Sequence, residues 1–481
     1  MSVSSLPSPY GIGTLGAQAY RFVDFLKEAG QKYWQLLPMG PTSYGDSPYA
    51  SFSSFAGNPY FIDLDVLISD NLLTKSDVQG TDWGDDAEKV DYGKIYVNRF
   101  EVLRKAYKKG RQKFESEIEA FYSENSRWLS NYALYMALKT SFDMRPWSEW
   151  PEDIKKRTPE AVERYSNELK EETDFWIFVQ YLFFRQWNAL KNYAHQQEIS
   201  FIGDVPIYVA MDSADVWAEP EFFQLDEDCI PKEVSGVPPD AFTEDGQLWG
   251  NPLYDYERMK ADGFGWWIRR IEGVSKLYDV IRIDHFRGFE TYWAVPYGEK
   301  TAKNGVWKKG PGMDLVGVLT SWFSNLEFIA EDLGYLTPEV RKLLADSGLP
   351  GMKVLEFAFD AHGDSVYLPH CCEANSCCYI GTHDNETALG WAEALPDDEK
   401  EFALKYTRIT EDEGWAYGMI RTGMATCSKL FVAQMQDVLE LGKAARMNIP
   451  GTQFENWTWR MTEFPPSDKM RELTEIYGRI Q

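Results

Sequence analysis

Short apolar runs recur along this chain, and most are separated by stretches in which apolar residues repeat with a helical period. The clearest runs cover residues 33–37, 201–209, 280–283, 328–330, 354–359 and 378–381, and helical periodicity is clear over 16–29, 266–277 and 338–344. Alternation of strands and helices is typical of a parallel sheet with helices outside it. Over 481 residues, an α/β fold of the closed (β/α)8 TIM barrel type fits this pattern better than an open doubly wound sheet.

Three glycines near the chain start, Gly11, Gly13 and Gly16, match the letters of the G-x-G-x-x-G nucleotide-binding signature. That signature requires a preceding strand, whereas here Pro7 and Pro9 come before it. We interpret these residues as a turn that leads into a helix.

Acidic residues outnumber basic ones, with 75 Asp and Glu against 49 Lys and Arg, for a net charge of −26. Nucleic acids and anionic membranes are bound by basic surfaces, so this charge argues against both as partners. No apolar run approaches the roughly 18 residues of a membrane-spanning helix, and residues 1–5 lack the features of a secretory signal. We expect a soluble, cytoplasmic protein.

The six cysteines include two adjacent pairs, Cys371-Cys372 and Cys377-Cys378. Adjacent cysteines do not form a disulfide framework, and their spacing differs from the C-x-x-C of zinc sites. We expect reduced thiols and no metal ligand, with a metal cluster as the alternative.

Carboxylates directly follow four of the predicted strands. Barrel enzymes carry their functional groups at the C-terminal ends of strands, and the residues there are Asp204, Asp284 with His285, Glu331 with Asp332, and Asp384 after His383. Any one of these carboxylates alone is better explained as a helix cap or a salt bridge at a strand–loop junction. Four together instead indicate one shared pocket.

Converging carboxylates suit glycosidic bond chemistry, in which one protonates the leaving oxygen and another attacks or stabilises the oxocarbenium-like carbon. In a retaining enzyme the two carboxyl groups lie roughly 5–5.5 Å apart. Burial and a like-charged neighbour would raise the pKa of the proton donor. Arg282 lies on the same side of its strand as Asp284 and would keep it ionised; a barrel-interior ion pair is a compatible interpretation. Aromatic residues, 15% of the chain, fit either a large core or platforms for sugar rings.

Two long segments interrupt the alternation of strands and helices. Residues 70–197 carry charged amphipathic stretches that predict a largely helical insert subdomain, at 98–109, 114–122, 129–140, 159–171 and 174–196. Residues 211–256 are rich in aromatic residues and proline, and so long a loop is usually functional or disordered. We expect a single catalytic barrel domain over residues 1–481, with the second insert over the candidate active site.

Several longer motifs occur in a fixed order. They are SLPSPYGIG at 5–13, SPY at 47–49, FAGNPY at 55–60, GDVPIYV at 203–209, GQLWGNPLY at 246–254, RIDHFRG at 282–288, AEDLG at 330–334, GTHDN at 381–385 and NIPGT at 448–452. With these motifs the chain resembles, over nearly its whole length, the 4-α-glucanotransferases (amylomaltases or disproportionating enzymes) of the α-amylase superfamily. Each motif is weak alone, but together they are highly specific.

The resemblance implies a (β/α)8 barrel with inserted subdomains and a role for each matching residue. It implies that Asp284 is the nucleophile, Glu331 the general acid/base and Asp384 the carboxylate that grips sugar hydroxyls and stabilises the transition state. The implied substrate contacts are Arg282, His285, His383 and Asp204 around the donor sugar, Gln247 and Trp249 on the loop over the cleft, Tyr49 and Ser47 on an acceptor-side wall, and Asn448 at the last strand.

The start of the chain departs from the family pattern. Family members have a few apolar residues before the Ser-Leu-Pro motif that form the first barrel strand, whereas Met1 falls in the middle of that strand. We expect either that the barrel closes with a shortened first strand or that the native start lies upstream. Stability is affected more than chemistry, since no catalytic position lies there.

The functional hypothesis is transfer of α-1,4-glucan segments from a donor malto-oligosaccharide to the 4-hydroxyl of glucose or another malto-oligosaccharide, by a retaining double displacement without a cofactor. Trp249 and Tyr49 would exclude water and hold the acceptor, although Trp249 as a packed loop anchor is an alternative. The competing functions are a hydrolase with the same carboxylates and a non-catalytic glucan-binding protein. Preferred chain length, cyclic products and oligomeric state are left open.

Overall fold

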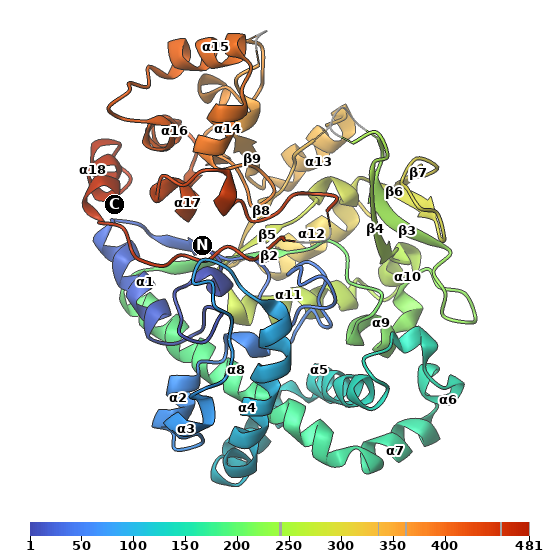
Figure 1. Cartoon of the computed structure of the whole chain (residues 1–481). Helices are drawn as coiled ribbons and strands as arrows, with labels where there is room; N and C mark the ends of the chain where they lie inside the picture. Colours follow the sequence, from blue (N-terminus) through green and yellow to red (C-terminus); the bar gives the residue numbers. More distant parts are fainter. Residues whose placement is uncertain (240–242, 335, 361–362, 453–454, 481) are drawn as a thin grey trace.

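The central element of the protein is a sheet of seven parallel strands that curves into a nearly closed barrel (Figure 1). The structure is a computed structural model that describes residues 1–239, 243–334, 336–360, 363–452 and 455–480. The barrel strands follow one another in chain order and are β1 (Tyr33–Gln35), β2 (Ser200–Val205), β5 (Val280–Ile283), β8 (Glu327–Ala330), β9 (Gly351–Val354), β10 (Ser376–Tyr379) and β11 (Leu430–Val432). This arrangement confirms the predicted TIM barrel class.

Two strand predictions differ from the structure. The apolar run at 354–359 is not a strand, because β9 ends at Val354 and the 3-10 helix η6 (Leu355–Phe357) follows it. A short buried run has the same hydrophobicity in either conformation, so periodicity alone does not separate them. Strand β11 was not predicted, although its three residues are all apolar.

The edge strands β1 and β11 face a cavity of about 610 Å³, which Met1, Trp34, Leu430 and Phe431 help to line. No shortened first strand forms there among the described residues, since Val3–Ser5 is the 3-10 helix η1. The Met1 amino group instead donates to the carbonyl of Gln35 at 3.4 Å, and the Trp34 indole donates to the carbonyl of Met1 at 2.7 Å. Met1 therefore contacts β1 through hydrogen bonds, while the two edge strands are not paired with each other.

Helices surround the barrel and follow its strands in the expected alternation. They are α1 (Ala17–Glu28), α11 (Gly265–Leu277), α12 (Met313–Trp322), α13 (Pro338–Ser347), α14 (Ala388–Ala394), α15 (Asp397–Thr407), α16 (Trp415–Met424), α17 (Met435–Val438) and α18 (Asp468–Ile476). The stretches 16–29, 266–277 and 338–344 all lie largely in these helices. Gly16 is the N-cap of α1, so the glycine-rich start is the predicted turn into a helix.

A group of helices between β1 and β2 occupies the lower part of Figure 1. Its members are α2 (Leu64–Ser69), α3 (Lys75–Val78), α4 (Tyr92–Lys113), α5 (Glu115–Ser141), α6 (Glu152–Lys155), α7 (Pro159–Glu168) and α8 (Lys170–Gln196). The stretches 114–122 and 129–140 are one continuous helix, α5, rather than two. We propose that residues 70–197 are a helical insert of the single domain.

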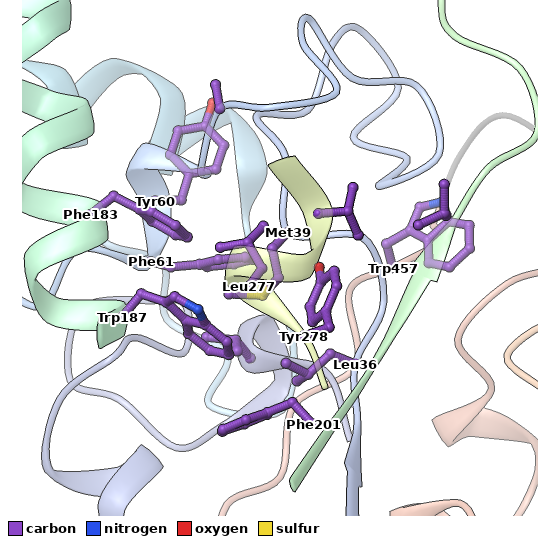
Figure 2. Packing of buried hydrophobic residues seen from close by; sticks show 14 of the residues in the cluster. Leu36, Met39, Tyr60, Phe61, Phe183, Trp187, Phe201, Leu277, Tyr278 and Trp457 are labelled. Carbon is purple, nitrogen blue, oxygen red and sulfur yellow. The ribbon is translucent and has the colours of Figure 1, made fainter. Parts of the chain in front are cut away.

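The helical group shares its core with the barrel. Figure 2 shows Phe183 and Trp187 of α8 beside Phe61 and the β2 residue Phe201. The ring centroids of Trp187 and Phe201 are 4.8 Å apart. A buried aromatic ring removes a large apolar area from water, so we expect α8 to stabilise the barrel as well as the helices.

Lys139 gives a test of this coupling. Its side chain is only 1% exposed, and its Nζ lies 2.6 Å from Asp212 of the segment after β2 and donates to the carbonyls of Met144 and Arg145. We predict that Lys139→Met lowers the free energy of unfolding in urea by about 1–3 kcal/mol, because the carbonyls of Met144 and Arg145 and the partly exposed carboxylate of Asp212 lose their common donor. Lys170→Met is the control, since that lysine and Asp174 form an exposed pair and such pairs contribute little. Equal effects of the two substitutions would contradict the prediction.

The predicted loop-rich segment 211–256 contains regular structure that the sequence analysis missed. Its described residues include α9 (Ala214–Ala218), β3 (Glu233–Val237), β4 (Gln247–Pro252) and the start of α10 (Tyr256–Ala261), while residues 240–242 lie outside the described residues. Strands β6 (Thr291–Pro296) and β7 (Val306–Lys309) complete an antiparallel sheet with the order β4-β3-β6-β7, at the right of Figure 1. Because β6 follows closely after the end of β5, this small sheet is anchored at the barrel mouth.

The remaining short 3-10 helices connect these elements: η2 (Pro59–Phe61), η3 (Trp147–Glu149), η4 (Pro220–Phe222), η5 (Phe286–Phe289), η7 (Pro369–Cys371) and η8 (Lys443–Ala445). None of the helices formed by the described residues combines the length and apolar character needed to cross a lipid bilayer.

Candidate active site

Arg282 organises the barrel interior between β2 and β5. It pairs in register with Asp204 on the neighbouring strand, so both side chains point to the same side. Its Nη1 donates to both oxygens of Asp204, at 2.6 and 2.7 Å, and to Asp284 at 3.0 Å. The guanidinium of Arg282 therefore forms an ion pair with Asp204 in the barrel interior and is also the cationic neighbour of Asp284. The two interpretations of Arg282 drawn from the sequence hold together.

Glu331 follows β8 and is held by main-chain donors. Its backbone N–H donates to the carbonyl of Ile283, which extends the β5–β8 ladder and places Glu331 beside the segment of Asp284. The carboxylate accepts from the backbone N–H of His285 at 2.7 Å and of Leu333 at 2.9 Å. Both oxygens are thus positioned by backbone groups.

His285 has a left-handed backbone conformation, with φ of 52°. A non-glycine residue there costs of the order of 1–3 kcal/mol and persists only where surrounding contacts enforce it. Here the turn directs the His285 N–H at Glu331. Burial and Arg287 lower the pKa of the His285 imidazole to about 3, so the ring is neutral near pH 7.

The protonation states of Asp284 and Glu331 are linked. Burial raises the pKa of Asp284 to about 6, while the positive charge of Arg282 acts in the opposite direction. Burial, followed by the negative charge of Asp284, raises the pKa of Glu331 to about 7. When the pair holds a single proton, that proton therefore resides mainly on Glu331.

Asp384 lies on the loop after β10. Asn448 donates to its Oδ1 at 2.6 Å, and the His383 Nε2 is 3.4 Å from the same oxygen. Burial alone would raise the pKa of Asp384, but the charge and hydrogen bond of His383 and the bond from Asn448 outweigh it and lower that pKa to about 2. Asp384 is thus a permanent anion at neutral pH.

An aromatic wall joins these groups. The Tyr49 ring stacks on His383 with centroids 5.0 Å apart, and its hydroxyl donates to Asp204 at 2.8 Å. Ser47 takes part only by accepting the backbone N–H of Tyr49 at 3.3 Å. The wall therefore connects the β2 end to the loop after β10.

The small sheet covers the site from the other side. Trp249 on β4 is 37% exposed and meets the His285 ring edge-on, with centroids 4.8 Å apart. Its indole N–H donates to the side chain of Gln247 at 3.2 Å. Trp249 thus contacts the site but keeps an open surface, which a buried loop anchor would not.

A family model described as 4-alpha-glucanotransferase matches residues 1–465. The chain belongs to the 4-alpha-glucanotransferase family. It is 50% identical to a 4-alpha-glucanotransferase of Clostridium butyricum over 487 aligned positions that span 100% of both chains, and 47% identical to one of Aquifex aeolicus over 100% of this chain and 98% of that one. Family membership makes it an enzyme, a transferase of the glycoside-hydrolase type.

The fold agrees with this assignment. An amylomaltase from Streptococcus agalactiae, solved in complex with acarbose, superposes with a TM-score of 0.97 at 42% identity and covers 99% of this chain and 98% of that one. An amylomaltase from Corynebacterium glutamicum, at 19% identity and a TM-score of 0.77, shares the fold.

The structure connects most of the sequence-predicted site residues of this glucanotransferase through direct contacts. Asp204, Arg282, Asp284, His285 and Glu331 form one cluster, and the second comprises Tyr49, His383, Asp384 and Asn448. Gln247 and Trp249 reach the first cluster through His285, whereas Ser47 contacts the second cluster through Tyr49. No group of three or more described His, Cys, Asp or Glu residues is arranged to hold a metal ion.

Trp457 is a site residue that sequence reasoning missed. Its ring centroid lies 5.8 Å from that of Tyr49 and 5.6 Å from that of His383. The sequence places Trp457 and a second tryptophan, Trp459, shortly after the NIPGT motif, and this proximity to a motif was the signal that could have pointed to Trp457. Without strand or helix periodicity, nothing in that stretch shows which ring faces the site.

Proposed function

We propose that this 4-alpha-glucanotransferase moves α-1,4-glucan segments from a donor malto-oligosaccharide to the 4-hydroxyl of glucose or another malto-oligosaccharide. The observation that supports this most is the pairing of Asp284 and Glu331 at the ends of adjacent strands, with the proton held more tightly by Glu331. One ionised and one protonated carboxyl group are what a retaining double displacement requires. Residues 211–256 would be the insert over this site.

In the first step, Glu331 protonates the glycosidic oxygen while Asp284 attacks the anomeric carbon. The glycosidic bond breaks, the leaving glucan departs with the proton, and a covalent glucosyl-enzyme remains. Glu331, now ionised, then takes the proton of the acceptor 4-hydroxyl as that oxygen displaces Asp284. The α-1,4 bond is restored, and both carboxyl groups return to their starting states.

The other side chains would orient the sugar at the point of cleavage. Asp384 is anionic and fixed by Asn448, so it can accept hydrogen bonds from sugar hydroxyls and stabilise positive charge at the reacting carbon. The neutral His285 ring and His383 supply further polar contacts. Asp204 and Arg282 hold the base of the site.

Maltotriose alone, with no other sugar added, tests this proposal. A ladder of longer maltodextrins together with glucose is expected, because each donor cleavage leaves a segment for another maltotriose to accept. Glucose and maltose as the only products would instead identify a hydrolase. No turnover at all would favour a non-catalytic glucan-binding protein.

We predict that Trp249→Ala raises the ratio of hydrolysis to transfer by about two- to tenfold. This factor corresponds to the loss of one aromatic contact with the acceptor, which contributes roughly 0.5–1.5 kcal/mol. The open surface of Trp249 would hold the acceptor ring and keep water out. Hydrolysis is measured by the increase in reducing ends, whose number transfer leaves unchanged, and transfer is measured by the maltodextrin ladder. Trp322→Ala, at a 67% exposed tryptophan on α12, is the control and is expected to leave the ratio unchanged.

The pH dependence of kcat/KM for maltotriose is predicted to be a narrow bell. Activity rises as Asp284 ionises near pH 6 and falls as Glu331 loses its proton near pH 7, since the active form needs the first ionised and the second protonated. The two limbs belong to the coupled pair. A profile that stays flat from pH 7 to 9 would contradict Glu331 as the acid.

A cytoplasmic location is also proposed. It is supported by six cysteines that are all free, which suits a reducing compartment. The net charge of −26 supports a partner set without nucleic acid or membrane.

A further inference from the structure

Arg446 lies behind Asp384 and uses all three of its guanidinium nitrogens there. Its Nη2 donates to the main-chain carbonyl of Asp384 at 2.6 Å, and its Nη1 to the Glu386 carboxylate at 2.6 Å. Its Nε donates to the main-chain carbonyl of Asn448 at 2.8 Å. One side chain therefore ties the loop after β10 to the segment that carries Asn448.

The two tied segments also contact each other through the groups that face the substrate. The Asn448 backbone N–H donates to the carbonyl of His383 at 3.1 Å, while its side chain donates to Asp384. Both bonds made by Asn448 depend on how residues 383–386 lie relative to residues 446–448. Loss of the Arg446 guanidinium would let the two segments shift relative to each other, because no helix or strand includes either segment.

Glu386 in turn fixes Arg446. The side chains of this ion pair are 20% and 27% exposed, and the Glu386 main-chain carbonyl accepts from the side chain of Gln434 at 3.1 Å. A partly buried, charge-assisted bond is shorter and stronger than a neutral one. The Arg446–Glu386 ion pair thus holds one end of the loop that carries Asp384 in place.

We propose that Arg446, fixed by Glu386, is a positioning residue that holds Asp384 and Asn448 in the geometry that stabilises the transition state. This rests on the proposed function, because it assumes that Asp384 acts on the reacting sugar. Arg446 reaches Asn448 and Asp384 through their main-chain carbonyls and is itself held by the Glu386 carboxylate. A positioning residue of this kind lowers kcat more than it changes KM, since a displaced Asp384 loses charge stabilisation that is made only in the transition state.

Arg446→Met and Arg446→Lys test the proposal in the maltotriose assay. Arg446→Met is expected to lower kcat by about 100-fold, the effect of a displacement near 1 Å in an active site, with KM changed less than threefold. Lys keeps the charge but not the three-way fork, so Arg446→Lys is expected to fall between Met and wild type. Glu386→Gln, which keeps an oxygen acceptor, is a second variant should Arg446→Met fail to fold.

A matched control is Arg421→Met. Arg421, on α16, forms an ion pair with Glu413 of similar exposure, 26% and 22%, and donates to the carbonyl of Thr407, the last residue of α15, at 3.0 Å rather than to the segments of Asp384 or Asn448. A comparable fall in melting temperature for both Met variants, with kcat lost only for Arg446→Met, supports positioning. Equal losses of kcat would assign Arg446 a structural role only.

The decisive comparison adds Arg446→Met to Asp384→Asn. If Arg446 acts through Asp384, the double variant is no slower than Asp384→Asn, because coupled residues are not additive. Losses that multiply would overturn the proposal, as would an unchanged kcat for Arg446→Met. Full activity of Asp384→Asn alone would instead overturn the role given to Asp384 under the proposed function.

Discussion

Replacing Asp284 with Asn is expected to lower kcat for maltotriose disproportionation by about 10⁴-fold or more, the scale seen when a covalent nucleophile is removed. The amide is a poor nucleophile and forms no glucosyl-enzyme. The neighbouring Arg282 would also face one carboxylate, Asp204, instead of two. Product ladders quantified over hours at high enzyme concentration measure the residual rate.

Asp332→Asn is the matched control for that experiment. Asp332 follows a barrel strand and is buried, but it accepts the backbone N–H of Met352 at 2.6 Å, a bond that an Asn oxygen also accepts. Its kcat is expected to stay within about threefold of wild type, because the Asn oxygen keeps the bond from Met352 and the volume of the side chain is conserved. Residual activity above 1% in Asp284→Asn would contradict the nucleophile assignment.

Replacing Glu331 with Gln is expected to lower kcat with maltotriose by about 10³-fold, within the 10²–10⁴ range of general acid–base catalysis. The amide oxygen still accepts from a backbone N–H, so substrate binding is expected to persist. A maltosyl fluoride donor separates the two roles of Glu331, because fluoride leaves without protonation. Formation of the maltosyl-enzyme from this donor should largely recover, and the alkaline limb of that step should disappear.

Three results would contradict the assignment of Glu331. They are full turnover of maltotriose by Glu331→Gln, no recovery with the fluoride donor, and a retained alkaline limb with that donor. Loss of substrate binding, measured by calorimetry with maltotriose, would mark Glu331 as a binding group instead. A parallel loss of melting temperature would trace the effect to the bonds from His285 and Leu333.

The identities of the site carboxylates follow from sequence reasoning. Strands are recognisable from local apolar runs, and parallel strands in a barrel bring their C-terminal ends to one mouth. Asp204, Asp284 and Glu331 each stand at or just beyond such an end. Arg282 was likewise predicted to face Asp284, because strand side chains alternate with a period of two.

Other features of the site carry no local signal. Trp457 and Arg446 lie in stretches without periodicity, and their contacts reach residues about 60 to 400 positions away in the chain. The left-handed backbone of His285 is also invisible locally, since a histidine favours negative φ and only the surrounding contacts enforce the turn. Strands β3 and β4 within 211–256 were missed for the same reason.

What the sequence by itself determined was the class of fold, the family and the carboxylates that end the strands, because these depend on periodicity and short motifs. Only the tertiary structure decided the charge state of each carboxylate. Asp284, Glu331 and Asp384 have ordinary intrinsic acidities, yet burial raises the pKa of the first two, while His383 and Asn448 lower that of the third. Solvent exclusion and charges from distant parts of the chain set these pKa values, and neither can be predicted from a local stretch of residues.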